Sequence, residues 1–311
     1  MFRLLQWSDS HADATCTAAT QTLISNTPDL DLCVHCGDIA RDNYQDGTNT
    51  YNQTLSVCVI GNHDALDESG TNPAGYEWNK QPSQSALYNS YLAESKSHFK
   101  LDMSVNTTWW SKEFTDKGVL VLGLNDTVPD SIRATEIEWL VNRLAYAKDN
   151  NLGVIIAKHG PSLYMNLVEN SFSSTYITTD LATDENYYAN HMYPGTEKLM
   201  TPIVQTDARV LCILCGHLHA DGFFYVNKND STRIPVIDIG STIIDKYNDV
   251  ARINNSSYTS AVVANIIEYD NASDALRVYR LGADGCYNGA ARKMLSHSYK
   301  ENKVVSICSV R

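Results

Sequence analysis

The sequence lacks three features that would point to membranes or long nucleic acids. It has no apolar run long enough to cross a bilayer, and the short run at its start is too brief for the core of a signal peptide. Basic residues are also scarce, with 24 Lys and Arg against 36 Asp and Glu, and the formal net charge is −12. Anionic membranes and long nucleic acids are normally bound by a basic face. We therefore expect a cytoplasmic protein that binds neither.

Eight cysteines are present, but no export signal accompanies them. In a chain of 311 residues without such a signal, reduced thiols are expected in place of a disulfide framework. Cys33 and Cys36, and likewise Cys212 and Cys215, have a spacing that occurs in zinc sites. Both pairs lie in apolar runs, where residues three apart point to opposite faces of a strand. Buried packing is the favoured interpretation, and a metal or redox role is the alternative.

Short apolar runs that end at glycine or at polar residues predict buried strands followed by functional loops. Four stretches have the character of helices instead, and 134–148 has an apolar face of helical period. The expected strands are 2–8, 30–36, 56–60, 118–124, 153–157, 209–214, 222–226, 234–240, 261–269 and 275–281, and the expected helices are 12–26, 85–97, 134–148 and 196–206.

These elements predict one domain over residues 1–282. Within it, residues 65–117 are rich in Asn, Ser, Tyr and Trp, which indicates an insertion beside a site. Residues 162–194 are polar and lack periodicity, so we expect a lid loop there. Residues 283–311 show little pattern and are expected to form a loosely attached tail.

Five polar clusters follow expected strands, and together they use five of the nine histidines. They are Asp9-Ser10-His11, Gly37-Asp38, Gly61-Asn62-His63-Asp64, His159-Gly160-Pro161 and Gly216-His217-Leu218-His219. Carboxylate, imidazole and amide oxygen ligands suit dications such as Mn, Fe or Zn, whereas thiolates are expected at a structural zinc site. Glycines beside the ligands allow sharp turns of the backbone. The pattern predicts a metal centre where these strands end.

The order of these clusters resembles the motifs of the calcineurin-like metallophosphoesterase superfamily, over the span from Asp9 to His219. The resemblance implies an α/β fold in which two mixed β-sheets pack as a sandwich flanked by helices. It also implies two divalent transition-metal ions (Mn, Fe or Zn). By this resemblance the first ion is held by Asp9, His11, Asp38 and His219, and the second by Asp38, Asn62, His159 and His217. Asp38 then bridges both.

The same resemblance assigns His63 to the substrate and not to a metal. His63 is expected to contact the phosphate, together with Asn62, and to protonate the leaving group as a general acid. Asp64 is expected to orient His63 by accepting its other ring proton. Arg41, shortly after Asp38, is either a phosphate contact or a solvated surface residue. His35 is expected to be structural, and Trp109-Trp110 to belong to the core and not to a base-stacking platform.

The implied function is hydrolysis of a phosphodiester or phosphomonoester by hydroxide that the two metals activate. The expected partner is a small-molecule or nucleotide phosphate ester. The Gly-Asn-His-Asp form resembles the phosphodiesterase-like branch more than the protein phosphatases, which usually carry Glu at the last position. A metal-dependent nuclease of the same superfamily is the runner-up, and a non-catalytic scaffold or assembly module is the other alternative. Residues 276–282 faintly resemble prophage-encoded members, which suggests association with a larger prophage-type assembly.

Overall fold

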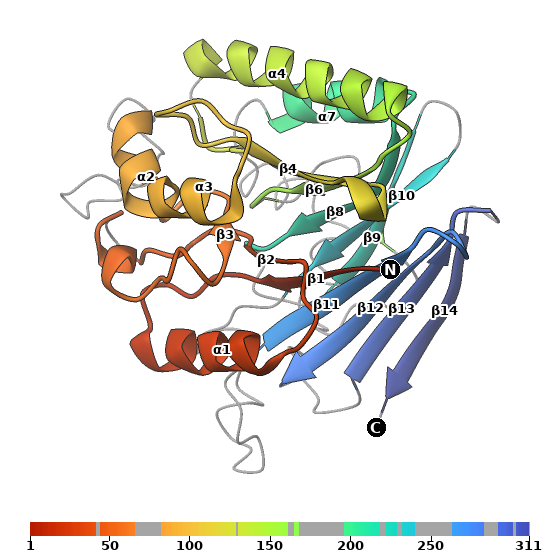
Figure 1. Ribbon diagram of the computed structural model, residues 1–311, viewed down its shortest axis with the longest axis horizontal. Helices are drawn as coiled ribbons and strands as arrows, with labels where there is room; N and C mark the ends of the chain where they lie inside the picture. The colour runs from red at the N-terminus through yellow and green to blue at the C-terminus, as the bar shows by residue number, and fades with distance from the viewer. Residues whose placement is uncertain are drawn as a thin grey trace.

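The computed structural model describes residues 1–41, 44–65, 82–128, 130–160, 165–167, 196–217, 222–228, 232–239, 263–282, 292–300 and 303–310. These residues form two mixed, seven-stranded β-sheets with helices on their outer sides (Figure 1). The expected sandwich of two mixed sheets is confirmed.

One sheet has the order β14-β13-β12-β11-β1-β2-β3. Its strands are β1 (Phe2–Trp7), β2 (Leu32–His35), β3 (Val57–Cys58), β11 (Val263–Asp270), β12 (Ala275–Gly282), β13 (Arg292–Ser298) and β14 (Lys303–Val310). Strands β1, β2 and β3 are parallel, while β11 to β14 form an antiparallel meander that joins β1 through β11.

The other sheet has the order β4-β5-β6-β8-β10-β9-β7. Its strands are β4 (Trp110–Phe114), β5 (Val119–Gly123), β6 (Gly153–Ala157), β7 (Met165–Leu167), β8 (Arg209–Cys215), β9 (Gly222–Asn227) and β10 (Arg233–Asp238). The central strands β5, β6, β8 and β10 are parallel.

Five α-helices lie within the described residues: α1 (Ala14–Asn26), α2 (Gln84–Tyr91), α3 (Ala93–Phe99), α4 (Asp130–Asp149) and α7 (Thr196–Gln205). Helices α4 and α7 cover the outer face of the β8 sheet, and α1 lies beside the β1 sheet (Figure 1). Helix α1 begins at an ordinary N-cap, where the Asp13 side chain accepts the Cys16 N–H. No helix in the described ranges is long and apolar enough to span a membrane.

Alternation along the strands builds two hydrophobic cores. In β5, Val119 and Val121 pack in the core that both sheets share, whereas Leu120 and Leu122 pack in the core beneath α4 and α7. This follows from the period of two in a strand, which sends successive side chains to opposite faces. Because both faces are covered, the strand is apolar throughout, as the sequence pattern predicted.

The C-terminal region corrects one prediction. The loosely attached tail is wrong for its described part, because β13 and β14 pair in register and extend the β1 sheet. The Tyr299 hydroxyl, just after β13, donates to the Leu211 carbonyl in the other sheet and ties this region to the sandwich.

The described part of the expected insertion, residues 65–117, differs from the prediction in detail. The helix expected at 85–97 is divided at Leu92 into α2 and α3, and β4 adds an edge strand that was not expected. Trp110 is fully buried and its indole N–H donates to the Cys58 carbonyl at 2.7 Å, so the core interpretation of Trp109-Trp110 is confirmed. Nearly all of the expected lid, 162–194, lies outside the described residues, apart from β7.

Candidate metal centre

The chain turns sharply at the ligand positions that follow β1, β2 and β8. Asp9, His11, Asp38 and His217 all have positive φ, between 43° and 77°. A non-glycine residue in this region costs on the order of 1 kcal/mol or more, and such residues gather where function requires a particular side-chain direction. Strands β1, β2 and β3 are parallel in one sheet, and β6 and β8 are parallel in the other. The polar loops that follow these strands lie together at one edge of the sandwich.

Asp38 lies at the centre of these loops. Its Oδ1 accepts the His63 backbone N–H at 2.8 Å, and its Oδ2 lies 3.2 Å from His159 Nε2. Two groups of side chains have ligand atoms close enough to share an ion: His11, Asp38 and His63, and Asp38, His159 and His217. Asp38 belongs to both groups, as a bridging ligand must.

The four residues expected at the second metal are all brought together. Asn62 Oδ1 lies 3.1 Å from His159 Nε2 and 3.1 Å from His217 Nδ1. His159 Nδ1 donates to the Cys36 carbonyl at 2.6 Å, so the other ring nitrogen faces the cluster. A backbone carbonyl in this position fixes the tautomer of a metal-binding imidazole.

Three of the four residues expected at the first metal are also together. His11 Nε2 lies 3.9 Å from Asp9 Oδ1, and the Asp9 carboxylate accepts the His217 N–H at 3.0 Å. The fourth, His219, lies outside the described residues. The His63 ring packs edge-to-face on His11 with centroids 4.7 Å apart, so the expected acid borders the metal ligands.

The expected contact between Asp64 and His63 is wrong. Asp64 is fully buried, and its two carboxylate oxygens accept the backbone N–H groups of Asp38, Ala40 and Gly61 at 2.7–2.9 Å. The His63 Nδ1 instead donates to the Arg41 carbonyl. A buried carboxylate requires several donors, and these three amides supply them within the two ligand loops. Asp64 therefore fixes the backbone on either side of the centre.

Arg41 contributes its carbonyl, while its side chain is exposed. The hydrogen bond to His63 therefore involves the Arg41 backbone and does not require its guanidinium. The expected role of the Arg41 side chain in substrate binding stays a prediction.

Electrostatics in the cluster favour positive charge at its centre. Burial raises the pKa of Asp38, but the surrounding imidazoles, His159 first, outweigh it and hold that pKa well below its usual range. Burial lowers the pKa of His159, but the carboxylates, Asp38 first, outweigh it and raise that pKa to about 10. A divalent cation can replace these protons as the counter-charge, and the carboxylate, imidazole and amide donor set fits such an ion.

Glycines next to the ligands allow this close packing. A Cβ at Gly37, which has a φ of 92°, would lie 2.6 Å from His159 Nδ1. A Cβ at Gly61 would overlap the Asp38 carboxylate, and one at Gly216 would overlap Ser8 and lie 2.6 Å from Asp9 Oδ2. Larger residues at these three positions would displace ligands.

A buried ion pair beneath His159 was not anticipated. Lys158 and Asp126 are both fully buried and their charged groups lie 3.0 Å apart. Asp126 Oδ2 also accepts the Gly160 N–H at 2.8 Å, and Lys158 Nζ donates to the Gly160 carbonyl. The pair therefore fixes the loop that presents His159. The signal in the sequence was Asn125-Asp126, another polar cluster directly after an expected strand.

Two alternatives from the sequence are settled by burial. His35 packs edge-to-face against Trp7, contacts Ser10 Oγ at 3.1 Å and accepts the Gly37 N–H. Its pKa is lowered to about 3, chiefly by burial, so it is structural as expected. Both cysteine pairs are buried free thiols whose pKa values are raised by burial, as the packing interpretation predicted.

Comparison with known proteins places this geometry in a family. The sequence model of the calcineurin-like phosphoesterase family matches residues 2–221 of this chain. Among solved structures, the chain is similar to a dimetal phosphatase from Danio rerio, with 13% identity, 96% of this chain and 99% of that chain covered, and a TM-score of 0.52. It is also similar to the NAD nucleotidase of Haemophilus influenzae, with 10% identity and a TM-score of 0.42. That match covers 99% of this chain and 49% of the nucleotidase chain. No curated protein sequence matches the chain.

Proposed function

The chain belongs to the calcineurin-like phosphoesterase family, and from this premise we propose that it is a binuclear metal-dependent phosphohydrolase. The observation that carries the proposal is Asp38, whose carboxylate lies close to a ring nitrogen of His11 and also to ring nitrogens of His159 and His217. A structural metal site would not need two ions that share one carboxylate, whereas hydrolysis of a phosphate ester uses such a pair.

The ligand residues are divided between two ions. Asp9, His11, Asp38 and His219 would hold the first, and Asp38, Asn62, His159 and His217 the second. Two divalent ions bound there supply Lewis-acid chemistry, which makes water nucleophilic at neutral pH and neutralises charge on the phosphoryl oxygens. The chain itself keeps the ligands at fixed positions through Asp64 and the Asp126–Lys158 pair.

His63 is the general acid of the proposed reaction. Because its Nδ1 donates to the Arg41 carbonyl, the proton for the leaving group is held at Nε2. The carbonyl keeps the ring oriented. His63 is partly exposed next to buried His11, so it can reach a substrate at the surface of the centre.

The proposed substrate is a phosphodiester or phosphomonoester of a small molecule or nucleotide. The net charge of −12 supports a small substrate over a long polyanion, since a nuclease normally has a basic groove. The candidate ligands in the described residues are all present, which supports catalysis over a scaffold role. The cytoplasmic location and the prophage-type assembly stay predictions from the sequence.

Metal content and substrate preference test this proposal. Protein purified without chelator is expected to contain close to two transition-metal ions per chain by elemental analysis, and to hydrolyse bis-p-nitrophenyl phosphate or p-nitrophenyl phosphate. The ratio of the two rates separates diesterase from monoesterase. A metal-free protein with full activity would refute the two-metal proposal, and a metal-loaded protein inactive on both esters would refute hydrolysis.

A further inference from the structure

A glutamine side chain crosses the core between the two sheets. Gln6 lies in β1 and is fully buried. Its Nε2 donates to the Cys215 carbonyl at 2.9 Å and to the Ile237 carbonyl at 3.1 Å. These carbonyls belong to β8 and β10 of the other sheet. A buried amide therefore connects β1 to the two strands opposite it.

The hydrogen bonds of Gln6 use both ends of its amide. A primary amide has two N–H donors, and the two backbone carbonyls of the other sheet accept them. The Gln6 Oε1 accepts the side-chain amide of Asn265 at 3.3 Å, and Asn265 is the register partner of Gln6 on β11. Carbonyls can only accept, so the nitrogen of Gln6 must face β8 and β10. Contacts with both sheets thus fix the orientation of this side chain.

The residues that Gln6 contacts lead directly into metal ligands. Cys215 is the last residue of β8 and lies two positions before His217. Cys36, which follows β2, places its Sγ 3.8 Å from Gln6 Nε2. The carbonyl of Cys36 accepts His159 Nδ1 at 2.6 Å. The amide of Gln6 therefore lies where segments of both sheets approach the second metal ion.

The ligands of this second ion come from both sheets. Asp38 and Asn62 follow β2 and β3, whereas His159 and His217 follow β6 and β8. Their ligand atoms meet only if the two sheets keep one separation and one offset at this edge. Apolar packing tolerates repacking, whereas a hydrogen bond is restricted in length and angle. A buried amide that lost its carbonyls would also be costly. A polar connection here is therefore suited to hold the two sheets at a fixed spacing.

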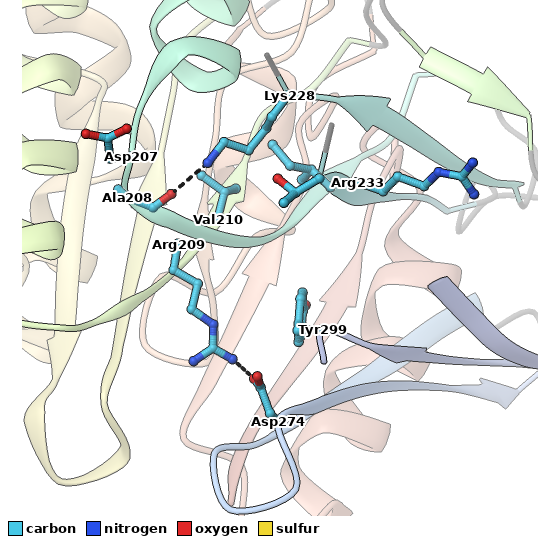
Figure 2. Close-up of a pocket in the computed structure, with 10 residues that line it drawn as sticks. Asp207, Ala208, Arg209, Val210, Lys228, Arg233, Asp274 and Tyr299 are labelled. Carbon is cyan, nitrogen blue, oxygen red and sulfur yellow. Dashed lines mark hydrogen bonds and ion pairs between the residues drawn. The ribbon is translucent and has the colours of Figure 1, made fainter. Parts of the chain in front are cut away.

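The other end of β8 offers a comparison. There the Arg209 guanidinium pairs with Asp274, from the turn before β12 of the opposite sheet (Figure 2). The Tyr299 hydroxyl donates to the Leu211 carbonyl of β8. Leu211 and Cys215 are four positions apart, which is about 13 Å along a strand. Strand β8 is thus connected to the opposite sheet near both of its ends, and of these contacts the one with Gln6 adjoins the ligands.

We propose that Gln6 is a positioning residue for the second metal ion, a role that rests on the proposed two-metal function. Its amide holds the sheets at the spacing at which His159 and His217 reach Asp38. The amide is engaged by two carbonyls and by Asn265, so Gln6 acts through the ligands and not as one of them.

Gln6→Met tests this role, because methionine fills a similar volume but cannot donate. The matched control is Tyr299→Phe, which removes a hydrogen bond to β8 at its other end. In Gln6→Met, titration with buffered Mn²⁺ is expected to show that one of the two ions binds about 10-fold more weakly, as for other groups that orient ligands. The weakened ion is expected to be the one that His159→Asn removes. Tyr299→Phe is expected to keep both affinities.

Electron paramagnetic resonance of the Mn²⁺-loaded protein gives a second readout. Two Mn²⁺ ions that share a carboxylate give a spin-coupled spectrum that isolated ions lack. At equal total Mn²⁺, Gln6→Met is expected to show less of the coupled spectrum, while Tyr299→Phe matches the wild type. Asn265→Leu, which removes the donor to Gln6 Oε1, is expected to have a smaller effect in the same direction. This variant carries the test if Gln6→Met does not fold.

The outcomes distinguish this role from general stabilisation. Wild-type affinities and spectrum in Gln6→Met, or in Asn265→Leu where the first variant does not fold, overturn the proposal. An equal loss in Tyr299→Phe also overturns it, because any weakened contact between the sheets would then suffice. A wild type that binds two ions but hydrolyses neither nitrophenyl ester refutes the proposed hydrolysis and leaves the role of Gln6 standing. A wild type that binds no ion overturns both.

Discussion

The two halves of the candidate metal centre share Asp38 but are supported differently. In the half formed with Asn62, His159 and His217, the ligand atoms contact one another directly, and the loop that carries His159 is fixed from below by Asp126 and Lys158. In the half formed with Asp9 and His11, the His11 Nε2 and Asp9 Oδ1 atoms lie 3.9 Å apart, and the His63 ring packs against His11.

This difference indicates how the two ions would behave. A half whose ligands are already arranged loses little conformational freedom when it binds metal, and its supporting contacts raise affinity. A half whose ligands are less closely arranged is expected to exchange its ion more readily. The proposed acid, His63, packs against His11 of this half.

Asp38→Asn is expected to have the largest effect, because it removes the residue common to both halves. Loss of a shared anionic ligand should lower the rate on both nitrophenyl esters more than about 1,000-fold, a barrier change of about 4 kcal/mol. Elemental analysis should show fewer than two ions per chain. Exposed Asp46→Asn is the matched control. Wild-type rates in Asp38→Asn would contradict the shared role.

Removal of one ligand from each half tests the asymmetry directly. Chelator treatment followed over time is expected to release the two ions in two phases, with rates that differ by roughly 10-fold or more. His11→Asn should eliminate the fast phase, and His159→Asn the slow one. The release of each ion is followed by measuring the metal content of the protein by mass spectrometry after each interval. A single phase for both ions would show that the halves are equivalent.

Asp126→Asn should affect the well-supported half alone. The change keeps the shape of the side chain but leaves the Lys158 ammonium buried without its counter-charge. We expect metal affinity at the His159 half to fall by about 10- to 100-fold, as for other residues that orient a ligand. Added metal should restore much of the activity. A fall in kcat that excess metal cannot reverse would contradict a positioning role.

A pH experiment probes His35, which contacts Ser10 and Gly37 beside the candidate metal centre. Its pKa is lowered from 6.5 to about 3, so the native state binds fewer protons than the unfolded state between these values. The stability from neutral His35 is complete above pH 6.5 and decreases as pH falls, by up to about 1.4 kcal/mol per unit. Denaturant unfolding at pH 5 and 7.5 should show a smaller pH dependence in His35→Gln. The exposed control His98→Gln should show the same pH dependence of the unfolding free energy as the wild type. If His35→Gln also shows the wild-type pH dependence, His35 is not its source.

Much of the centre could be predicted from the chain because its ligands follow short apolar strands. Asp9, Asp38, Asn62, His159 and His217 each come shortly after a strand that the pattern predicted, and parallel strands bring their ends to one edge. The strands β13 and β14 were not predicted, although β14 contains Val304, Val305 and Ile307; their pairing with β12 is what defines them as part of the sheet.

The roles of charged groups behind the ligands depended on three-dimensional contacts. Spacing placed Asp64 next to His63 in the chain, but successive residues at a tight turn point in different directions, and Asp64 turned inward to three amides. Asp126 and Lys158 are 32 positions apart, so only the packing of β5 against β6 brings them together.

The sequence by itself determined the residue types that follow the strands, because strand period and ligand preference are properties of short segments. The two-sheet architecture and the reaction class came from the resemblance of these motifs to the calcineurin-like metallophosphoesterases. The tertiary structure decided that the Asp64 carboxylate faces three backbone amides, that the Arg41 carbonyl accepts from His63, and that Lys158 pairs with Asp126 beneath His159. Each depends on distances between segments remote in the chain, which only the packed sheets define.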